Sequence, residues 1–235
     1  GRYSNTERMS EVFDLLKHMI LITLGVELVG AIAIYMSVGP EFTAMGINRV
    51  FFAVFHAISS FCNAGFSLLP DGLMNEVVVY NYNMQLIIAL IYIFGGLGFP
   101  IVVNTLTYAK YVLKRLIGRW QSKKNLHRPW VLNLNSKINL VTTAIISLFA
   151  TLILFLNEYG YTLAAHSGIG KVVIAFATAT TPRTAGFNSI DFGTLQFSSI
   201  LFIMLLMWIG ASPNSTGGGI KTSTFAVAFL NVMSL

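Results

Sequence analysis

The sequence predicts an all-α membrane protein made of two tandem, parallel units. Each unit is a span, a short pore helix, a re-entrant loop and a second span, and the final span is broken. Of the 235 residues, 55% are hydrophobic and 10% are charged, and the mean hydropathy is +0.71. Soluble domains carry about 25% charged residues, so this composition indicates a protein embedded in a bilayer. A motif ending in Ala-Gly-Phe occurs twice, and its glycines, Gly65 and Gly186, lie 121 positions apart.

The first unit is predicted to occupy residues 1–120. Its first span covers residues 18–38, because a bilayer requires about 20 mostly apolar residues. The apolar run 48–61 is too short to cross and predicts a pore helix. The second span covers about residues 84–109. Within it we expect a kink or a close-packed face at Gly95-Gly96-Leu97-Gly98-Phe99-Pro100.

The second unit, residues 121–235, repeats this order. A span is predicted at about residues 138–157 and a pore helix at about 168–181. The last span begins near Leu195, is interrupted at residues 210–219, and resumes from Ile220. We call residues 210–219 the broken-span loop. Glycine and proline disrupt helical hydrogen bonding there, and such a stretch is stable at membrane depth only where it lines a cavity. A kinked packing helix is the alternative.

Basic residues are concentrated between the two units. The segment 110–137 contains eight of the 15 Lys and Arg residues and no acidic residue: Lys110, Lys114, Arg115, Arg119, Lys123, Lys124, Arg128 and Lys137. The positive-inside rule places this connector, which begins near residue 110, in the cytoplasm. Each unit crosses the membrane twice, so both chain ends share that side and both re-entrant loops enter from outside. Topology alone explains the net charge of +6; lipid headgroups or a partner protein are an alternative reason, and nucleic acid is not required.

Two short segments are candidates for an ion filter. Glycine lets a loop turn so that successive carbonyl oxygens face one axis, where they can replace the hydration shell of potassium. The short helices would direct their partial negative C-terminal ends to the same place. We expect Phe66 and Phe187 to pack behind the filter. The candidate filter residues are Asn63, Ala64, Gly65, Phe66, Thr184, Ala185, Gly186 and Phe187.

These motifs resemble the Trk/Ktr/HKT superfamily of potassium transporters. The stretches that carry the resemblance are Phe-His-Ala-Ile-Ser-Ser-Phe-Cys-Asn-Ala-Gly-Phe-Ser from Phe55, Thr-Pro-Arg-Thr-Ala-Gly-Phe-Asn from Thr181 and Gly-Ala-Ser-Pro-Asn-Ser-Thr-Gly-Gly-Gly-Ile-Lys-Thr from Gly210. The resemblance covers essentially the whole chain and follows the second and third units of the family. It places Gly65 and Gly186 on the filter glycines of those units.

Members of that superfamily carry four units in one chain. The resemblance therefore implies that this sequence is a fragment, or a cut, of a longer transporter. An arginine that the family carries in its fourth unit has no position here.

The resemblance also implies a function and partners. It implies potassium uptake across the plasma or inner membrane of the cell, driven by the membrane potential, with sodium as a candidate coupling ion. It implies a homodimer of full-length pore subunits on a cytoplasmic ring that binds a regulatory nucleotide, with residues 110–137 near the docking face and no covalent cofactor. The broken-span loop becomes a gate below the filter, with the residues Gly210, Ser212, Asn214, Ser215, Thr216, Gly217, Gly218 and Gly219.

Other functions are weaker alternatives. A sodium channel or transporter would differ only in ion preference. An intramembrane hydrolase could use Ser59, Ser60 and His56, but it explains neither the repeat nor the glycines. A small-solute channel with two half-spanning loops would carry Asn-Pro-Ala, which is absent. Residues 217–222 do not form a phosphate-binding loop, because Ile220 separates the glycines from Lys221.

Three further residues carry separate expectations. Glu27, inside the first span, is expected to pair with a helix end or a neighbouring unit, outside the ion path. His56 is expected to pack and to form a hydrogen bond behind the filter. Arg183 is expected to brace the outer mouth or to pair with Asp191.

Overall fold

The computed structural model describes residues 2–40, 42, 46–120 and 133–234. Within these residues the chain is all-helical, and the single extended pairing is an isolated parallel bridge between Ile209 and Ile220. The predicted fold class is confirmed. The central part of the basic connector, residues 121–132, lies outside the described residues.

The helices of the first half follow the predicted order. They are α1 (Arg2–Ser37), α3 (Arg49–Phe61), α4 (Tyr82–Leu97) and α5 (Phe99–Trp120), with the short 3-10 turn η1 (Gly72–Met74) before α4. In α1, residues Val12–Ser37 are long and apolar enough to cross a membrane. The pore helix α3 begins one residue after the predicted start of the run, because the Asn48 side chain caps it by accepting hydrogen bonds from Val50 N and Phe51 N.

The predicted second span, residues 84–109, changes direction at the glycine motif where a kink or a close-packed face was expected, and the change is sharp: α4 and α5 are bent by 110°. Gly98 ends α4 with a φ of +80°, a conformation that glycine adopts without strain. Pro100 then lies in the first turn of α5, where its missing N–H leaves no helical bond unmade. The glycines and proline therefore make a corner rather than a kink.

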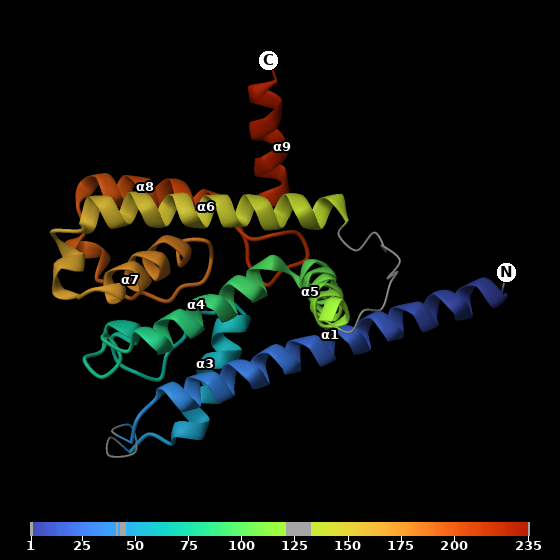
Figure 1. The fold of residues 1–235 in the computed structure, drawn as a ribbon, viewed down its shortest axis with the longest axis horizontal. Coiled ribbons are helices and arrows are strands. Elements are labelled where there is room, and N and C mark those ends of the chain that lie inside the picture. Colours follow the sequence, from blue (N-terminus) through green and yellow to red (C-terminus); the bar gives the residue numbers. More distant parts are fainter. Residues whose placement is uncertain (1, 41, 43–45, 121–132, 235) are drawn as a thin grey trace.

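The second half repeats the pattern with a shorter last span. Its helices are α6 (Leu134–Glu158), α7 (Ile169–Thr180), α8 (Phe197–Trp208) and α9 (Thr222–Met233), with the 3-10 turns η2 (Thr162–Ala165) and η3 (Phe192–Thr194) beside α7 and α8. Helix α6 is long and apolar enough to cross a membrane. The break between α8 and α9 contains the whole broken-span loop, and Figure 1 shows that α9 does not continue the direction of α8.

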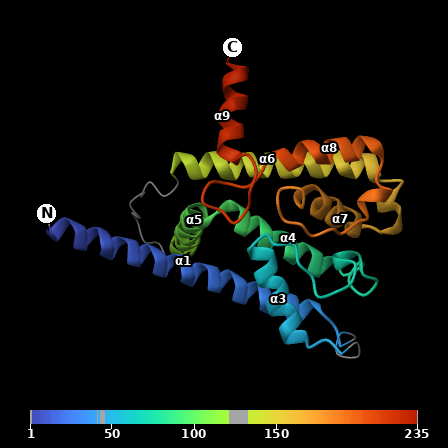
Figure 2. The ribbon, with the colours of Figure 1, turned by 180° about the vertical axis from the view of Figure 1, so that it is seen from behind.

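The two halves run in the same direction. In Figure 1, α1 and α6 both run from right to left, and α4 and α8 both return from left to right. The reverse view in Figure 2 shows the same relation. The long connections before α4 and α8 consequently lie at one end of the molecule, and the N-terminus lies at the other. The structure agrees with parallel, not inverted, units.

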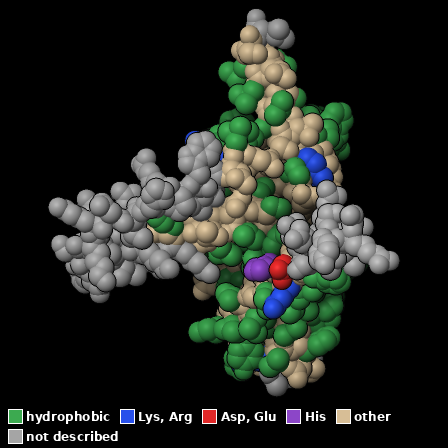
Figure 3. Space-filling model, turned by 90° about the vertical axis from the view of Figure 1, so that its right-hand side faces the viewer, with side chains coloured by type: hydrophobic (Ala, Val, Ile, Leu, Met, Phe, Trp, Pro, Cys, Tyr) green, Lys and Arg blue, Asp and Glu red, His purple; other side chains and the backbone are tan. Residues whose placement is uncertain are grey.

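The two halves share a core but leave large apolar faces open. The core around α1, α3 and α4 includes Ala185 and Phe187 from the second half. Tyr92 of α4 also donates a hydrogen bond to Ala177 O on α7 (3.3 Å), and its hydroxyl lies 2.6 Å from Thr180 Oγ1. Outside this core, α1 and α6 expose rows of large apolar side chains, and Figure 3 shows hydrophobic side chains over much of the described surface. Such faces suit lipid or further membrane helices.

Candidate functional site

Both candidate filter segments begin where a pore helix ends. Helix α3 ends at Phe61 and helix α7 at Thr180, so the last carbonyl groups of each helix precede Asn63 and Thr184 by only a few residues. A helix C-terminus carries a partial negative charge of roughly half an elementary charge. The two helices therefore present their negative ends next to the two segments.

The two segments share one backbone conformation. Asn63 and Thr184 have φ values of +52° and +70°, and the glycines two residues later, Gly65 and Gly186, have φ values of +71° and +79°. The alanines between them do not have positive φ. Asn63 and Thr184 are not glycines, and such residues seldom adopt this region, so its occurrence at equivalent positions is a structural sign of the repeat. Alternation of left-handed and ordinary conformations allows neighbouring carbonyl groups to point to the same side.

A hydroxyl group fixes the end of each segment. Ser59 Oγ donates to Phe66 O at 2.8 Å, and Thr181 Oγ1 donates to Phe187 O at 2.6 Å. The carbonyl groups that follow the glycines are therefore turned back toward the pore helices. The carbonyl groups left without this constraint are those of residues 63–65 and 184–186.

The two glycines lie in direct contact. A side chain at Gly65 would place its Cβ 2.8 Å from the Cα of Gly186 and 2.9 Å from the carbonyl oxygen of Gly186. A Cβ at Gly186 would lie 3.1 Å from the Cα of Gly65. Since distances under 3.0 Å between a Cβ and backbone atoms do not occur without movement, Gly65 cannot accept a larger residue in this arrangement. The structure thus brings together the two segments that the sequence singled out.

The aromatic residues after the glycines differ in their surroundings. Phe187 is buried and stacks on Tyr92, with ring centroids 6.4 Å apart. Phe66 is 70% exposed in this chain, so only Phe187 packs behind its segment as expected. His56 is fully buried; its Nδ1 donates to Phe52 O (2.9 Å), and its Nε2 lies 3.0 Å from Ser67 Oγ. It therefore braces the first segment from behind, as we predicted.

The broken-span loop is docked on α4 and on the first pore helix. Ser212 N donates to Gly96 O (2.9 Å), and Thr216 N donates to Gly95 O (3.4 Å). The Thr216 hydroxyl donates to Phe61 O at 3.1 Å and lies 3.1 Å from the side-chain nitrogen of Asn63. The glycine motif of the predicted second span is thus a dock for the loop, and this explains its small residues.

The loop also closes on itself. Gly210 N donates to Ile220 O (3.0 Å), and Ala211 N donates to Gly218 O (3.1 Å). Lys221 Nζ donates to Gly217 O at 2.9 Å. Gly217 lies against the second filter segment, since a Cβ there would collide with the hydroxyl of Thr184. The loop therefore lies immediately beside both candidate filter segments.

Arg183 lies against the broken span, and the structure records no bond between Arg183 and Asp191, so the predicted pairing is wrong, whereas the predicted brace at the outer mouth stays a prediction. The Arg183 side chain points into the broken span and donates to Ile209 O (3.4 Å), Gly210 O (3.1 Å) and Thr222 Oγ1 (3.0 Å). Asp191 instead caps the turn η3 by accepting from Gly193 N at 2.9 Å. Sequence separation gave no indication that Arg183 would reach a loop about thirty residues later; the carbonyl groups freed by the break are what attract it.

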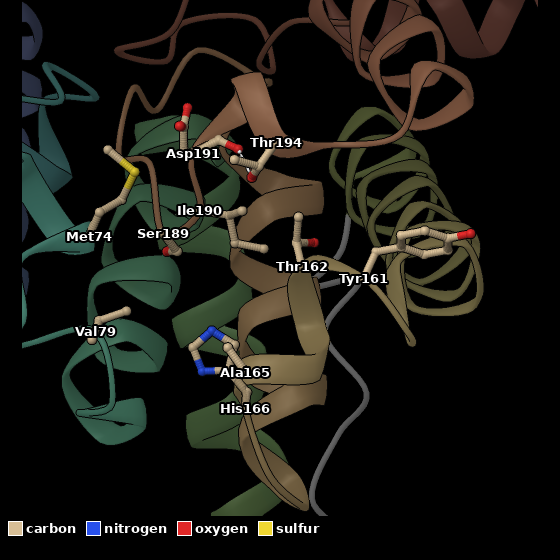
Figure 4. Close-up of a pocket in the computed structure, with 10 residues that line it drawn as sticks. All are labelled: Met74, Val79, Tyr161, Thr162, Ala165, His166, Ser189, Ile190, Asp191 and Thr194. Atoms are coloured by element: carbon tan, nitrogen blue, oxygen red, sulfur yellow. Dashed lines mark hydrogen bonds between the residues drawn. The ribbon is translucent and has the colours of Figure 1, made fainter.

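The long connections before α4 and α8 line an open pocket of ≈ 480 Å³. Figure 4 shows Met74 and Val79 from the first half facing Thr162 and Ile190 from the second half. His166 lines this pocket beside the hydroxyl of Tyr82 (3.2 Å), and burial together with the charge of Lys171 lowers the pKa of His166 from its usual value. Among the described residues, no group of three or more His, Cys, Asp or Glu could hold a metal ion.

The residues considered for a hydrolase do not assemble. Ser60 Oγ donates to the backbone oxygen of His56 (2.5 Å), and the Ser59 hydroxyl is used by Phe66 O. One nitrogen of the His56 ring lies against the hydroxyl of Ser67, and the other nitrogen of the ring is bonded to the backbone oxygen of Phe52. Glu27 is half-buried on α1, and its pairing with a helix end or a neighbouring unit stays a prediction.

Sequence reasoning missed the residue that links the two halves and the roles of the two hydroxyl residues that hold the filter ends. Tyr92 connects α4 to α7, and Ser59 and Thr181 hold the filter ends. A signal was present for the second group, because each pore helix ends in two adjacent hydroxyl residues, Ser59-Ser60 and Thr180-Thr181. No comparable signal marked Tyr92, an aromatic residue in an apolar helix.

Comparison with known proteins gives consistent results. Residues 4–234 match the family described as TrkH, cation transport protein. The chain is 33% identical over 232 residues to Ktr system potassium uptake protein B of Bacillus subtilis, covering 98% of this chain and 47% of that protein. It is 33% identical over 234 residues to potassium/sodium uptake protein NtpJ of Enterococcus hirae, with the same coverage. The chain therefore spans about half the length of these relatives.

A solved structure shares the fold. The crystal structure of the potassium transporter TrkH from Vibrio parahaemolyticus superposes with a TM-score of 0.68 at 18% identity. The similarity covers 97% of this chain and 42% of that one. At this identity the likeness concerns the fold alone.

Proposed function

We propose that this chain, which belongs to the TrkH family of cation transport proteins, forms two walls of a potassium-uptake pore in a cell membrane. Residues 1–120 and 121–235 would be two of four pore units, the others lying in the remaining half of the parent protein. The names of the relatives from Bacillus subtilis and Enterococcus hirae support potassium as the cargo. The exposed apolar faces of α1 and α6 fit lipid and the missing units.

One observation carries the proposal. Two segments that are far apart in the chain adopt the same unusual backbone conformation, and their glycines touch. A single strained turn has many explanations, but a matched pair beside two helix C-termini suits a shared axis of carbonyl oxygens. Carbonyl oxygens around such an axis can replace the water lost by potassium.

The proposed filter consists of backbone groups, not of charged side chains. The carbonyl groups of residues 63–65 and 184–186 would face the ion, while those of Phe66 and Phe187 are held by hydroxyl groups. Inward movement of one positive charge across 100 mV gains about 2.3 kcal/mol, so the membrane potential can drive uptake. No hydrolysis within this chain is required.

The broken-span loop would act as the gate. It lies beside both filter segments and is rich in glycine and small polar residues, with positive φ at Asn214 and Gly219. The connector 110–137 would lie in the cytoplasm, near a partner ring that binds the regulatory nucleotide, and the full-length subunit would dimerise. These partners rest on the superfamily resemblance.

The filter is tested by Gly65→Ser and Gly186→Ser in the full-length parent. Each serine must leave the positive-φ region or push against the other segment, so potassium-over-sodium preference should fall by about tenfold or more. Potassium and sodium fluxes into proteoliposomes measure this preference. Gly72→Ser is the matched control, because Gly72 also has positive φ (+61°) but has open space around its Cβ position. Unchanged preference in both filter variants would contradict the filter assignment.

Sodium is the second candidate cargo. The name of the Enterococcus hirae relative, a potassium/sodium uptake protein, favours it. The same flux assay on the unaltered parent decides between the two, since a sodium flux equal to or above the potassium flux would make this a sodium pathway.

A further inference from the structure

Arg183 joins the second filter segment to the broken span. It directly precedes Thr184, and its guanidinium group reaches the backbone oxygens of Ile209 and Gly210 at 3.4 and 3.1 Å. It also donates to the hydroxyl of Thr222, the first residue of α9, at 3.0 Å. One side chain thereby contacts both ends of the break.

These bonds satisfy carbonyl groups that the break has freed. The last carbonyls of a helix have no partner inside it, and α8 ends at Trp208. Thr222 also satisfies one of these carbonyl groups, because its hydroxyl donates to Gly210 O at 3.1 Å and the residue is fully buried. Gly210 O thus accepts two hydrogen bonds, one from the guanidinium group of Arg183 and one from the hydroxyl of Thr222.

The three partners of Arg183 are uncharged oxygens. A guanidinium is planar and offers five N–H donors in a fixed arrangement, so it can bridge several carbonyl groups at once, which an ammonium cannot do as well. Water can replace each of these partners when the loop moves away. The contact is therefore strong when formed and reversible.

We propose that Arg183 is a latch, a positioning residue that holds the broken-span loop against the filter and ties movement of the loop to the second filter segment. The latch rests on the proposed function, since it acts on the gate of that pore. Removing it takes away the side-chain hydrogen bonds that tie the loop to the residue before the second filter segment, while the contacts of Ser212 and Thr216 with α4 remain. The loop should then open more often, with the filter itself intact.

The test uses the full-length parent with a reporter cysteine at Ser212→Cys in a Cys62→Ser background. Ser212 is 1% exposed and its hydroxyl has no hydrogen-bond partner among the described residues, so the reporter replaces a side chain that makes no bond. The rate of modification by a water-soluble thiol reagent in detergent reports opening of the loop and requires no transport. Arg183→Gln should raise this rate about tenfold or more, because hydrogen bonds to a charged donor are lost. Arg183→Lys should restore part of the protection.

Arg49→Gln is the matched control. Arg49 also donates to backbone oxygens, those of Tyr35 and Val38, but at the end of α1 remote from the loop in sequence and fold. Its substitution should leave the modification rate unchanged. An equal rise in Arg49→Gln, or no rise in a monodisperse Arg183→Gln protein, would overturn the latch.

Thr222→Val keeps the test decisive should Arg183→Gln fail to fold. It removes one partner of Arg183 and keeps the charge, so the rate should rise severalfold, roughly two to five times. Where both variants fold, their effects should be less than additive, because they break the same contact. Fully additive effects of the two substitutions on the modification rate would contradict the latch. Loss of potassium preference in the unaltered parent would end the proposed function but leave the modification rates meaningful, so the two failures are distinguishable.

Discussion

At the scale of single residues, the two copies use different side chains to hold the carbonyl oxygen of the residue after the filter glycine. Ser59 holds Phe66 O in the first copy, and Thr181 holds Phe187 O in the second. Thr181 corresponds by position to Ser60, so the holding hydroxyl has shifted by one residue. The counterpart of helical Phe61 is Pro182, which has no N–H to continue the helix, and α7 accordingly ends at Thr180. The earlier helix end moves the next hydroxyl into the holding position.

Thr181→Val tests this role in the full-length parent. Valine has nearly the shape of threonine but leaves the buried Phe187 O without its donor, which should cost about 1–3 kcal/mol and weaken potassium-over-sodium preference. Thermal unfolding and paired ion fluxes measure the two effects.

Thr178→Val is the control on the same helix. The hydroxyl of Thr178 is buried without a hydrogen-bond partner, so its removal should leave stability unchanged or raise it. Equal behaviour of the two variants would mean that the Thr181 hydroxyl does not hold the segment.

At the scale of elements, the corner between α4 and α5 determines where the broken-span loop lies. The last turn of α4 offers Gly95 O and Gly96 O to the loop, and Gly98 passes close to Asn214 O. Helix α5 then leads directly into the basic connector.

Gly95→Ala should disturb this corner and Gly96→Ala should not. A Cβ at Gly95 would collide with the carbonyl oxygen of Phe61, whereas a Cβ at Gly96 would meet its nearest atom, on Asn63, at 3.4 Å. Overpacking against backbone typically costs about 1–3 kcal/mol, so Gly95→Ala should lower the midpoint of thermal unfolding of the parent by several degrees. Gly96→Ala should stay close to the unaltered protein. Similar midpoints for both would show that the corner yields without strain.

The sequence predicted helices better than it predicted their relations. Both pore helices and the break at residues 210–219 follow from local rules, namely the length of apolar runs and the effects of glycine and proline. The 110° corner did not follow, because Gly98 and Pro100 allow either a kink or a turn, and the loop that packs against them decides. The partners of Arg183 were equally out of reach, since a long side chain can reach many carbonyl groups and only the folded chain selects among them.

At the scale of the whole molecule, the parallel arrangement places comparable parts of both units at the same end. The connections before α4 and α8 lie together in Figure 1, and the pocket of Figure 4 is formed between them. Helix α5, which carries the first residues of the basic segment 110–137, and the start of α6 lie toward the opposite end. This polarity predicts which positions meet the outside of the cell.

Single cysteines in a Cys62→Ser background of the parent test this orientation. A cysteine at Tyr161, which is 66% exposed in the outer connection, should react with a membrane-impermeant maleimide in intact cells. A cysteine at Ser122, in the basic connector, should react only after permeabilisation. The reverse pattern would invert the orientation and place the proposed gate on the outer side.

The contact between Gly65 and Gly186 also constrains which substitutions each copy can accept in evolution. After a duplication, each copy is ordinarily free to collect its own changes. Here a side chain added to Gly65 would press on the backbone of the other copy, and one at Gly186 would come close to Gly65. Neither copy can therefore change alone at this point, whereas the holding hydroxyl groups, which act in separate places, differ between the copies in residue type and in position. These two glycines should therefore stay identical in the two copies for longer than the residues around them.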